Sequence, residues 1–386
     1  MKKEASIIFT GDIGFDRYMT KKWEDEQLLS TDILDFFNSA DHVVANVEGA
    51  LTDAKDDGSK GIYFHSMDPE AVSLLEKINA DIYCIANNHT MDAGRKGIED
   101  TLALAEKLGC KTVGAGTDVD SASAPIYLPE AGGIGIIAVG YHPDCIAAGT
   151  QKPGVFAWND MERIKARVKE IKDKCRWCII IAHGGEEFAA LPSPYTRDRY
   201  LEYINFGADI VVGHHPHVPE NYEIIENGQK AVFYSLGNFI FDTDYQRAHA
   251  FTDTGVLLKI SLNEESFSFD AIGTKLVRGE QRLYSAPLPA IFANVPADGY
   301  EKLTPLAAQA FIAEERRRLI FIHPGKYKNA DASVWDSYFY SEDIDGYDKG
   351  AHMDFGIVCE IASRFDEKSI ADDTLDGVKK HLLSFL

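Results

Sequence analysis

Five polar clusters, each directly after an apolar run typical of a β-strand, constrain this chain more than any other feature. They are Gly11-Asp12, Asn46-Val47-Glu48, Asn87-Asn88-His89 with Asp92, His183 with Glu187, and Gly213-His214-His215-Pro216-His217. In α/β folds, the carboxyl ends of strands form the edge on which binding sites are built. Five such ends carrying Asp, Asn, Glu or His predict one shared site for hard or borderline divalent metals.

Strand-like and helix-like segments alternate from the N-terminus. Strands are expected over 6–10, 41–46, 81–86, 134–140, 177–182 and 209–213, and helices over 69–78, 95–108, 160–174 and 194–206. Three further strands, over 231–235, 255–262 and 266–275, have no helices between them, which indicates an antiparallel portion. The pattern predicts an α/β sandwich with two central sheets and outer helices.

The composition changes after residue 277. Loops and aromatic residues dominate there, with helical patterns over 303–320 and 372–385. We therefore expect a core unit over residues 1–277 and a C-terminal extension of unassigned role over residues 278–386.

Composition restricts the class of partner. The formal net charge is −22, which argues against nucleic acid because nothing would neutralise phosphates over a broad surface. The chain begins with a strand and lacks an apolar run long enough for a signal peptide or membrane span, so we expect a cytoplasmic protein. Six scattered cysteines indicate reduced thiols, and the lone Cys175-x-x-Cys178 pair is not expected to bind zinc.

Carboxylates follow the first two expected strands. Asp12 can bind a hard cation through oxygen, or it can cap the next segment. Asn46 and Glu48 are two residues apart, so both side chains point to the same side of an extended strand end. The alternative is a turn-forming Asn beside an exposed Glu.

Imidazoles follow the later strands. His183 precedes two glycines, which leaves room for a ligand or substrate. His215 and His217 flank Pro216 on a segment expected to be extended, which points both imidazoles the same way, a common metal-binding arrangement. A single His of this kind is more often structural, but several at strand ends favour a metal site.

The segment around residues 87–92 offers acid–base chemistry. An Asn oxygen can bind a metal, and the adjacent His89 can protonate a substrate oxygen. Asp92 is close enough in sequence to orient His89. The alternative is a helix-capping Asn pair beside a surface His. Ser235 and Asn238, after another strand, are further site-lining candidates, and no phosphate-binding loop, Rossmann fingerprint or G-x-S-x-G elbow is present.

In this order, the clusters resemble the CapA or PGA-cap family of capsule synthesis, linked to poly-γ-glutamate, in the calcineurin-like metallophosphoesterase superfamily. The resemblance extends from Gly11-Asp12, with Arg17, to Tyr234-Ser235-Leu236-Gly237-Asn238-Phe239. It implies a four-layer αββα fold and divalent ions such as Mn, Fe, Zn or Mg. The implied metal-ligand positions are Asp12, Glu48 as a bridge, Asn88, His183, His215 and His217. The implied catalytic residues are His89, as general acid, and Asp92. The implied substrate contacts are Arg17, Asn46, Glu187, Ser235 and Asn238.

Two positions depart from the family pattern. The superfamily usually opens with Asp-x-His, but Gly14 stands at the second ligand position. We therefore expect one tightly bound metal and one weakly bound, oxygen-preferring ion such as Mn²⁺ or Mg²⁺, and Gly14→His is expected to strengthen the weak site. Gly184 replaces the Trp of the family's His-Trp-Gly motif, which is expected to open space near His183.

Three functions fit these observations. The first is a metal-dependent phosphoesterase-type hydrolase of a small molecule or polymer. The second is a non-hydrolytic binding or assembly protein for an acidic polymer such as poly-γ-glutamate. The third is metal-independent chemistry on a peptide, at its α-carbon or amide, with His or Glu as base. The sequence leaves the substrate and the oligomeric state open.

Overall fold

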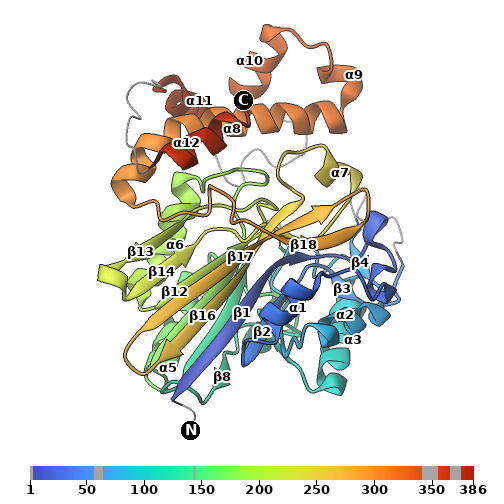
Figure 1. Ribbon diagram of the computed structural model, residues 1–386, viewed down its shortest axis with the longest axis vertical. Coiled ribbons are helices and arrows are strands. Elements are labelled where there is room, and N and C mark those ends of the chain that lie inside the picture. Colours follow the sequence, from blue (N-terminus) through green and yellow to red (C-terminus); the bar gives the residue numbers. More distant parts are fainter. Residues whose placement is uncertain (1–2, 56–63, 142–144, 341–354, 366–374) are drawn as a thin grey trace.

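Two sheets organise the molecule (Figure 1). The computed structural model describes residues 3–55, 64–141, 145–340, 355–365 and 375–386. In spatial order, the eight-stranded sheet contains β18 (Arg282–Ala286), β17 (Phe267–Val277), β16 (Thr254–Asn263), β1 (Glu4–Ile13), β2 (His42–Val47), β5 (Ile82–Cys84) and β6 (Lys111–Val113), with β15 (Asn238–Ile240) also paired with β1. The six-stranded sheet contains β13 (Tyr222–Ile225), β14 (Lys230–Phe233), β12 (Ile210–His214), β11 (Trp177–His183), β9 (Ile134–Gly140) and β8 (Ile126–Leu128).

Helices and short strands complete the fold. The helices that accompany the sheets are α1 (Thr31–Phe37), α2 (Val72–Lys77), α3 (Gly94–Leu108), α4 (Val119–Ala122), α5 (Met161–Lys172), α6 (Pro194–Phe206) and α7 (Asp244–Arg247). The 3-10 helices are η1 (Arg17–Met19), η2 (Lys22–Glu24), η3 (Pro69–Ala71) and η4 (Glu226–Gly228). Two small sheets pair β3 (Ala50–Leu51) with β4 (Ser66–Met67) and β7 (Ala115–Gly116) with β10 (Gly154–Val155).

Side-chain alternation in the six-stranded sheet explains its layers. Ile179 and Ile181 of β11 lie in the large core that also contains the strands of the eight-stranded sheet. Ile180, between them, lies in a second core with Val168 of α5 and Tyr203 of α6. Because successive side chains of a strand point to opposite faces, one face of this sheet packs toward the other sheet and the other face packs against helices. The expected α/β class is therefore confirmed.

Local signals in the sequence set several element ends. The Asp160 side chain accepts a hydrogen bond from the backbone N–H of Arg163 and caps α5. Gly109 ends α3 in the left-handed conformation, with φ of 73°. The expected antiparallel portion is confirmed for the last two strands, because β16 pairs antiparallel with both β1 and β17. The strand expected over 231–235 differs: it corresponds to β14, which pairs parallel with β12 in the other sheet, and α7 lies between it and β16.

The C-terminal helices lie at one end of the sheets (Figure 1). They are α8 (Ala297–Ile322), α9 (Pro324–Tyr327), α10 (Ala332–Tyr340), α11 (Phe355–Ser363) and α12 (Asp376–Leu383). The helix expected over 303–320 lies within α8, and the one expected over 372–385 begins among residues 366–374, outside the described part. Leu303 of α8 packs in one cluster with Leu191, which follows β11. β18 extends the sheet beyond residue 277, and the division of the chain there stays a prediction.

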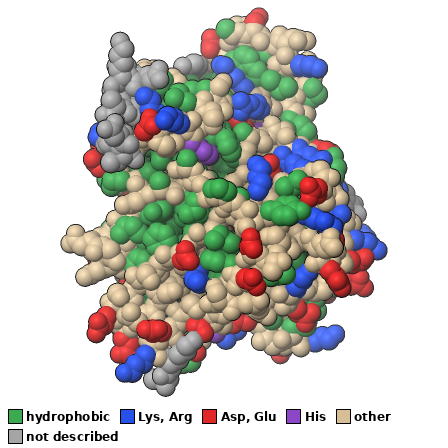
Figure 2. Space-filling model, viewed as in Figure 1, with side chains coloured by type: hydrophobic (Ala, Val, Ile, Leu, Met, Phe, Trp, Pro, Cys, Tyr) green, Lys and Arg blue, Asp and Glu red, His purple; other side chains and the backbone are tan. Residues whose placement is uncertain are grey.

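The surface carries charges of both signs. On the face shown in Figure 2, Lys and Arg side chains are interspersed with Asp and Glu. Among the described residues, no helix combines the length and apolar character needed to cross a membrane. All six cysteines are free thiols.

One ion pair joins the starts of β2 and β5 and predicts a pH-dependent stability. His42 Nδ1 lies 2.6 Å from Asp81 Oδ2, and the hydrogen bond with Asp81 raises the pKa of His42. Because the folded-state pKa is raised, this contribution is complete below the unfolded-state pKa and is lost as pH rises through the folded-state value. Asp81→Asn should therefore reduce the free energy of unfolding by about 1 kcal/mol near pH 5.5, and by less near pH 9.

Urea denaturation at both pH values measures this difference. Asp270→Asn is the control, because Asp270 is mostly exposed and its ammonium partner, Lys259 Nζ, is 4.0 Å away. An equal loss of stability at both pH values would show that the ion pair does not act through His42 ionisation.

Candidate metal centre

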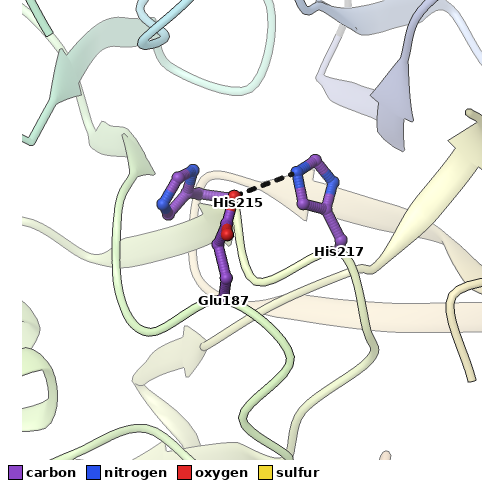
Figure 3. Close-up of side chains that lie close together, drawn as sticks. All are labelled: Glu187, His215 and His217. Carbon is purple, nitrogen blue, oxygen red and sulfur yellow. Dashed lines mark ion pairs between the residues drawn. The ribbon is translucent and has the colours of Figure 1, made fainter. Parts of the chain in front are cut away.

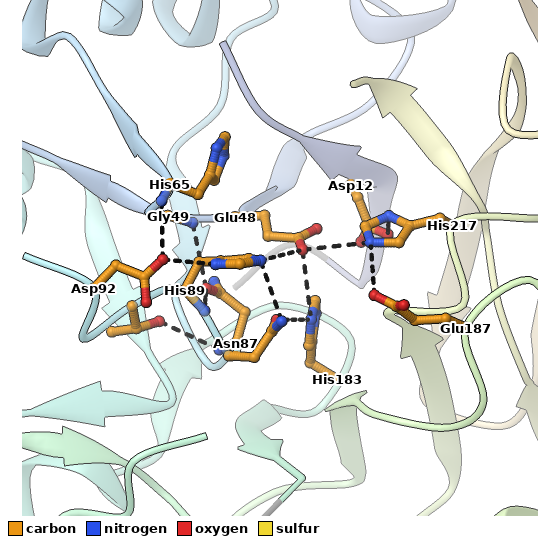
Figure 4. A network of polar contacts seen from close by, with 12 residues as sticks. Asp12, Glu48, Gly49, His65, Asn87, His89, Asp92, His183, Glu187 and His217 are labelled. Carbon is orange, nitrogen blue, oxygen red and sulfur yellow. Dashed lines mark hydrogen bonds and ion pairs between the residues drawn. The ribbon is translucent and has the colours of Figure 1, made fainter. Parts of the chain in front are cut away.

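Strand ends from both sheets meet at one site (Figure 4). Asp12 lies near the end of β1, and Glu48 directly follows β2 in the eight-stranded sheet. His183 ends β11, and His217 follows β12 in the six-stranded sheet. Asn88, after β5, contacts His183, because its Oδ1 lies 3.0 Å from His183 Nε2. The structure therefore brings together polar clusters separated by more than a hundred residues.

Asp12 is held rigidly in a buried position. Asn46, its register partner in β2, donates from Nδ2 to Asp12 Oδ1 at 2.6 Å. Asp12 Oδ2 lies 3.2 Å from His217 Nδ1. Burial raises the pKa of Asp12, but the His217 hydrogen bond and nearby imidazoles outweigh it, so the net shift is downward. A Cβ at Gly11 would lie 2.2 Å from the Gly237 carbonyl oxygen, so β15 can approach β1 only beside a glycine.

Glu48 is the most unusual group in the site. Its side chain is fully buried, yet neither carboxylate oxygen has a hydrogen-bond partner among the described residues. Glu48 Oε1 instead lies 3.7 Å from His217 Nε2, 3.9 Å from His89 Nε2 and 4.0 Å from His183 Nε2. Burial, followed by the Asp12 charge, raises the pKa of Glu48 well above its usual value. Buried polar atoms normally have partners, so these oxygens fit ligands of a cation.

The surroundings of His183 favour its neutral form. Its Nδ1 has no hydrogen-bond partner among the described residues. Burial, followed by the neighbouring imidazoles, lowers the pKa of His183 well below its usual value. A neutral imidazole is the form that binds metals.

His215 and His217 correct one expectation. Both have positive φ, 100° and 60°, so their segment is not extended as predicted from sequence. Such backbone is strained in residues other than glycine and occurs preferentially at functional sites. The carbonyl of Pro216 between them accepts from the backbone N–H of Phe188 at 2.8 Å, which ties this turn to the loop after β11. The two rings still lie close together, with centroids 6.0 Å apart.

His217 is oriented by its neighbours. Its Nδ1 lies 2.9 Å from Asn238 Oδ1 and also faces Asp12, so Nε2 faces Glu48 and Glu187. Burial lowers the pKa of His217, but the surrounding carboxylates outweigh this effect and raise it to about 10. Two groups of three side chains could each hold a metal ion, because the ligand atoms within each group lie within 4.8 Å of one another. One group is Asp12, Glu48 and His183, and the other is Glu187, His215 and His217, drawn in Figure 3.

His89 and Asp92 form a pair beside these groups. His89 Nδ1 lies 2.7 Å from Asp92 Oδ2, as the short sequence separation predicted. Burial lowers the pKa of His89, against the raising effect of Asp92. The backbone N–H of His65 donates to the same Asp92 oxygen at 2.9 Å, and the His65 ring lies 5.3 Å from the His89 ring. Our interpretation of the sequence missed His65, although the short apolar run Ile62-Tyr63-Phe64 precedes it.

The expected substrate contacts have different environments. Asn46 and Asn238 contact Asp12 and His217 directly. Ser235 is buried and donates to the Val218 carbonyl, at 2.8 Å. Arg17 is exposed in η1, and the Glu187 carboxylate faces the imidazoles of His215 and His217.

The two departures from the family pattern leave no empty space. A Cβ at Gly14 would lie 2.7 Å from His65 Nε2 and 2.7 Å from the Phe241 ring. A Cβ at Gly184 would lie 2.5 Å from the Trp158 ring, so the space expected near His183 is filled by another aromatic side chain.

The packing around Gly14 reverses the expected effect of Gly14→His. A side chain there must displace His65 or Phe241, and such overpacking costs about 1–3 kcal/mol. We expect Gly14→His to lower the melting temperature and to leave metal affinity unimproved, measured by calorimetry with Mn²⁺. A stable variant with tighter Mn²⁺ binding would show that this packing yields to an imidazole.

The unpartnered Glu48 carboxylate predicts opposite effects of Glu48→Gln with and without metal. Without metal, the variant should be more stable by about 1 kcal/mol, because glutamine avoids the cost of burying an ionisable carboxyl group beside Asp12. With metal at about 100 times its Kd, the unmodified protein should gain about 2.7 kcal/mol, and the variant should gain little.

Thermal denaturation with and without Mn²⁺ tests both effects. Glu202→Gln is the control, since that side chain is partly exposed and pairs with Arg199 on α6. A Glu48→Gln variant that keeps the full metal-dependent stabilisation would exclude Glu48 as a ligand.

Two curated proteins are similar to this chain in sequence. The PGA biosynthesis protein CapA of Bacillus subtilis (strain 168) is 33% identical over 249 residues, which cover 63% of this chain and 64% of that protein. The capsule biosynthesis protein CapA of Bacillus anthracis is 29% identical over 223 residues, covering 55% of this chain and 53% of that protein. The chain thus spans less than two thirds of the length of these relatives.

A solved structure and a family profile complete the comparison. A hypothetical protein from Thermus thermophilus is 14% identical, with 69% of this chain and 98% of that chain covered and a TM-score of 0.43. The profile described as "Bacterial capsule synthesis protein PGA_cap" matches residues 6–243, which contain every candidate ligand named above. The chain belongs to the PGA_cap family of bacterial capsule synthesis proteins.

Proposed function

We propose that this protein is a metal-dependent phosphoesterase-type hydrolase that serves poly-γ-glutamate or capsule biosynthesis. The observation that carries the proposal is the Glu48 carboxylate, which is fully buried, has no hydrogen-bond partner among the described residues and lies within 4.0 Å of three imidazoles. The two packed sheets with helices outside support a four-layer metallophosphoesterase-like sandwich over residues 1–277, followed by the C-terminal extension.

Six side chains are the proposed metal ligands. They are Asp12, Glu48, Asn88, His183, His215 and His217. The mixture of imidazole, carboxylate and amide donors suits Mn, Fe or Zn, and the oxygen donors also suit Mg. Bound divalent ions would supply Lewis-acid activation of water and neutralise charge that develops on a phosphoryl group.

His89 is the proposed proton donor. Asp92 holds its Nδ1 at 2.7 Å, so Nε2 is directed toward Glu48 and the candidate ligands. A proton on Nε2 can pass to the oxygen of a leaving group. Asp92 keeps the ring orientation and favours the charged form that has this proton.

The surrounding residues divide into three proposed roles. Asn46 and Asn238 position Asp12 and His217, since their side chains contact these ligands. Arg17, exposed in η1, is the cationic candidate for an anionic substrate. Ser235 supports the turn at Val218 through its hydrogen bond to the backbone.

The names of the relatives favour a second candidate function. The Bacillus proteins are named for biosynthesis rather than for hydrolysis. A protein that binds or hands on an acidic polymer, with weak hydrolysis, would suit those names. Calorimetry with γ-linked glutamate oligomers, with and without Mn²⁺, separates binding from turnover of an aryl phosphate.

Replacing His89 separates the proton donor from the ligands. His89→Ala should reduce aryl phosphate turnover by roughly 10²–10⁴-fold, because general acid catalysis contributes that much. Metal content by elemental analysis should stay close to that of the unmodified protein, because His89 is outside the proposed ligand set.

His42→Ala is the control, because that imidazole lies at the start of β2, away from the carboxyl ends that form the site. Loss of metal from His89→Ala would make His89 a ligand. Turnover that is absent in the unmodified protein with added metal would favour the binding function.

A further inference from the structure

The proposed ligand set leaves out Glu187, a carboxylate beside the imidazoles of His215 and His217. Its Oε1 lies 3.9 Å from His217 Nε2, and Glu48 Oε1 lies 3.7 Å from the same nitrogen. Donors about 2.1 Å from one tetrahedral cation are roughly 3.4 Å apart. Glu187, His215 and His217 each offer a ligand atom within 4.8 Å of the others, so modest shifts would bring these three side chains around one ion.

A carboxylate at this position is unfavourable for an anionic substrate. Asp12, Glu48 and Glu187 all lie close to His217, so the site already holds three acidic side chains. A phosphate or a glutamate polymer would be repelled by Glu187, whereas a cation would be attracted. Glu187 is therefore better suited to a metal than to the substrate role expected from sequence.

The need for a ligand such as Glu187 arises at Gly14. Gly14 has no side chain, and the space that a side chain would occupy there is filled by His65 and Phe241. The Phe241 ring packs on His217 with centroids 5.0 Å apart. A ligand for the ion at His217 must therefore come from another element, and Glu187 on the loop after β11 faces this imidazole (Figure 3).

Residues beyond the matched family region hold Glu187. The Tyr245 hydroxyl of α7 donates to Glu187 Oε2 at 2.8 Å, which leaves Oε1 toward His217. Phe188 next to it stacks on His249, with centroids 3.7 Å apart, and His249 Nδ1 lies 2.8 Å from Glu314 Oε2 of α8. The family profile ends at residue 243, so the part of the chain after it contributes directly to the site.

We propose that Glu187 is the metal ligand that replaces the imidazole missing at position 14, and that Tyr245, on α7, positions it. This inference rests on the proposed metal-dependent function. The metal ion bound by His217 would then have an additional oxygen donor. The segment after residue 243 would contribute to metal binding through Tyr245.

Calorimetry with Mn²⁺ alone, on metal-free full-length protein, tests the assignment. The unmodified protein should show a tight and a weaker binding event. Glu187→Gln keeps the shape and the Tyr245 hydrogen bond but removes the charge, and it should weaken one event by more than about tenfold while the other is unchanged. Tyr245→Phe should weaken the same event by roughly tenfold, as removal of a ligand's hydrogen-bond partner does.

Two variants serve as matched controls. Tyr127→Phe removes a similar hydrogen bond, in which the hydroxyl of Tyr127 on β8 donates to Glu170 of α5 at 2.9 Å. Glu202→Gln removes a carboxylate on α6 that pairs with Arg199. Neither should change Mn²⁺ binding, and circular dichroism checks that every variant folds.

Glu187→His adds a readout that a purely structural role would not change. In Co²⁺-loaded protein, the visible absorption spectrum depends on the donor atoms, so exchange of oxygen for nitrogen should shift it. Unchanged Mn²⁺ binding in Glu187→Gln, or an unchanged Co²⁺ spectrum in Glu187→His, would overturn the Glu187 assignment and leave the proposed function intact. Absence of metal binding in the unmodified protein would instead overturn the proposed function.

Discussion

Burial of two carboxylates among imidazoles is the constraint on which the rest of the site depends. Asp12 and Glu48 are both fully buried, and burial of uncompensated charge is costly. The pKa of Glu48 is raised and that of His217 is raised to about 10, so a proton shared in this cluster offsets part of the cost. A divalent cation would offset more of it. The cluster is therefore one that could hold a metal ion.

The two sheets make this cluster possible. Parallel strands β1, β2 and β5 in one sheet and β11 and β12 in the other end at the same place. The first sheet contributes Asp12 and Glu48, and the second contributes His183, His215, His217 and Glu187. Close backbone approach at Gly11 brings β15 beside β1, and Asn238 then reaches His217. Packing between sheets thus determines the distances between the candidate ligands.

The C-terminal helices change how the family site is understood in this chain. Contacts through Tyr245, Phe188 and His249 link the loop after β11 to Glu314 of α8. Tyr245, His249 and Glu314 lie outside the region that matches the family profile. Departures from the family pattern at Gly14 and Gly184 are accompanied by His65, Phe241 and Trp158, which occupy the corresponding volumes. The site is therefore repacked rather than opened.

Periodicity and strand-end chemistry in the sequence determined the α/β class, most element positions and most of the residues that meet at the site, though not His65. Those signals are local, because an apolar run and the polar residue after it are neighbours in the chain. Only the tertiary structure decided the positive φ of His215 and His217, the filling of the space at Gly14 and the contact of Tyr245 with Glu187. Each of these depends on which distant segments pack together, and no local pattern encodes a contact between the loop after β11 and a helix that follows much later in the chain.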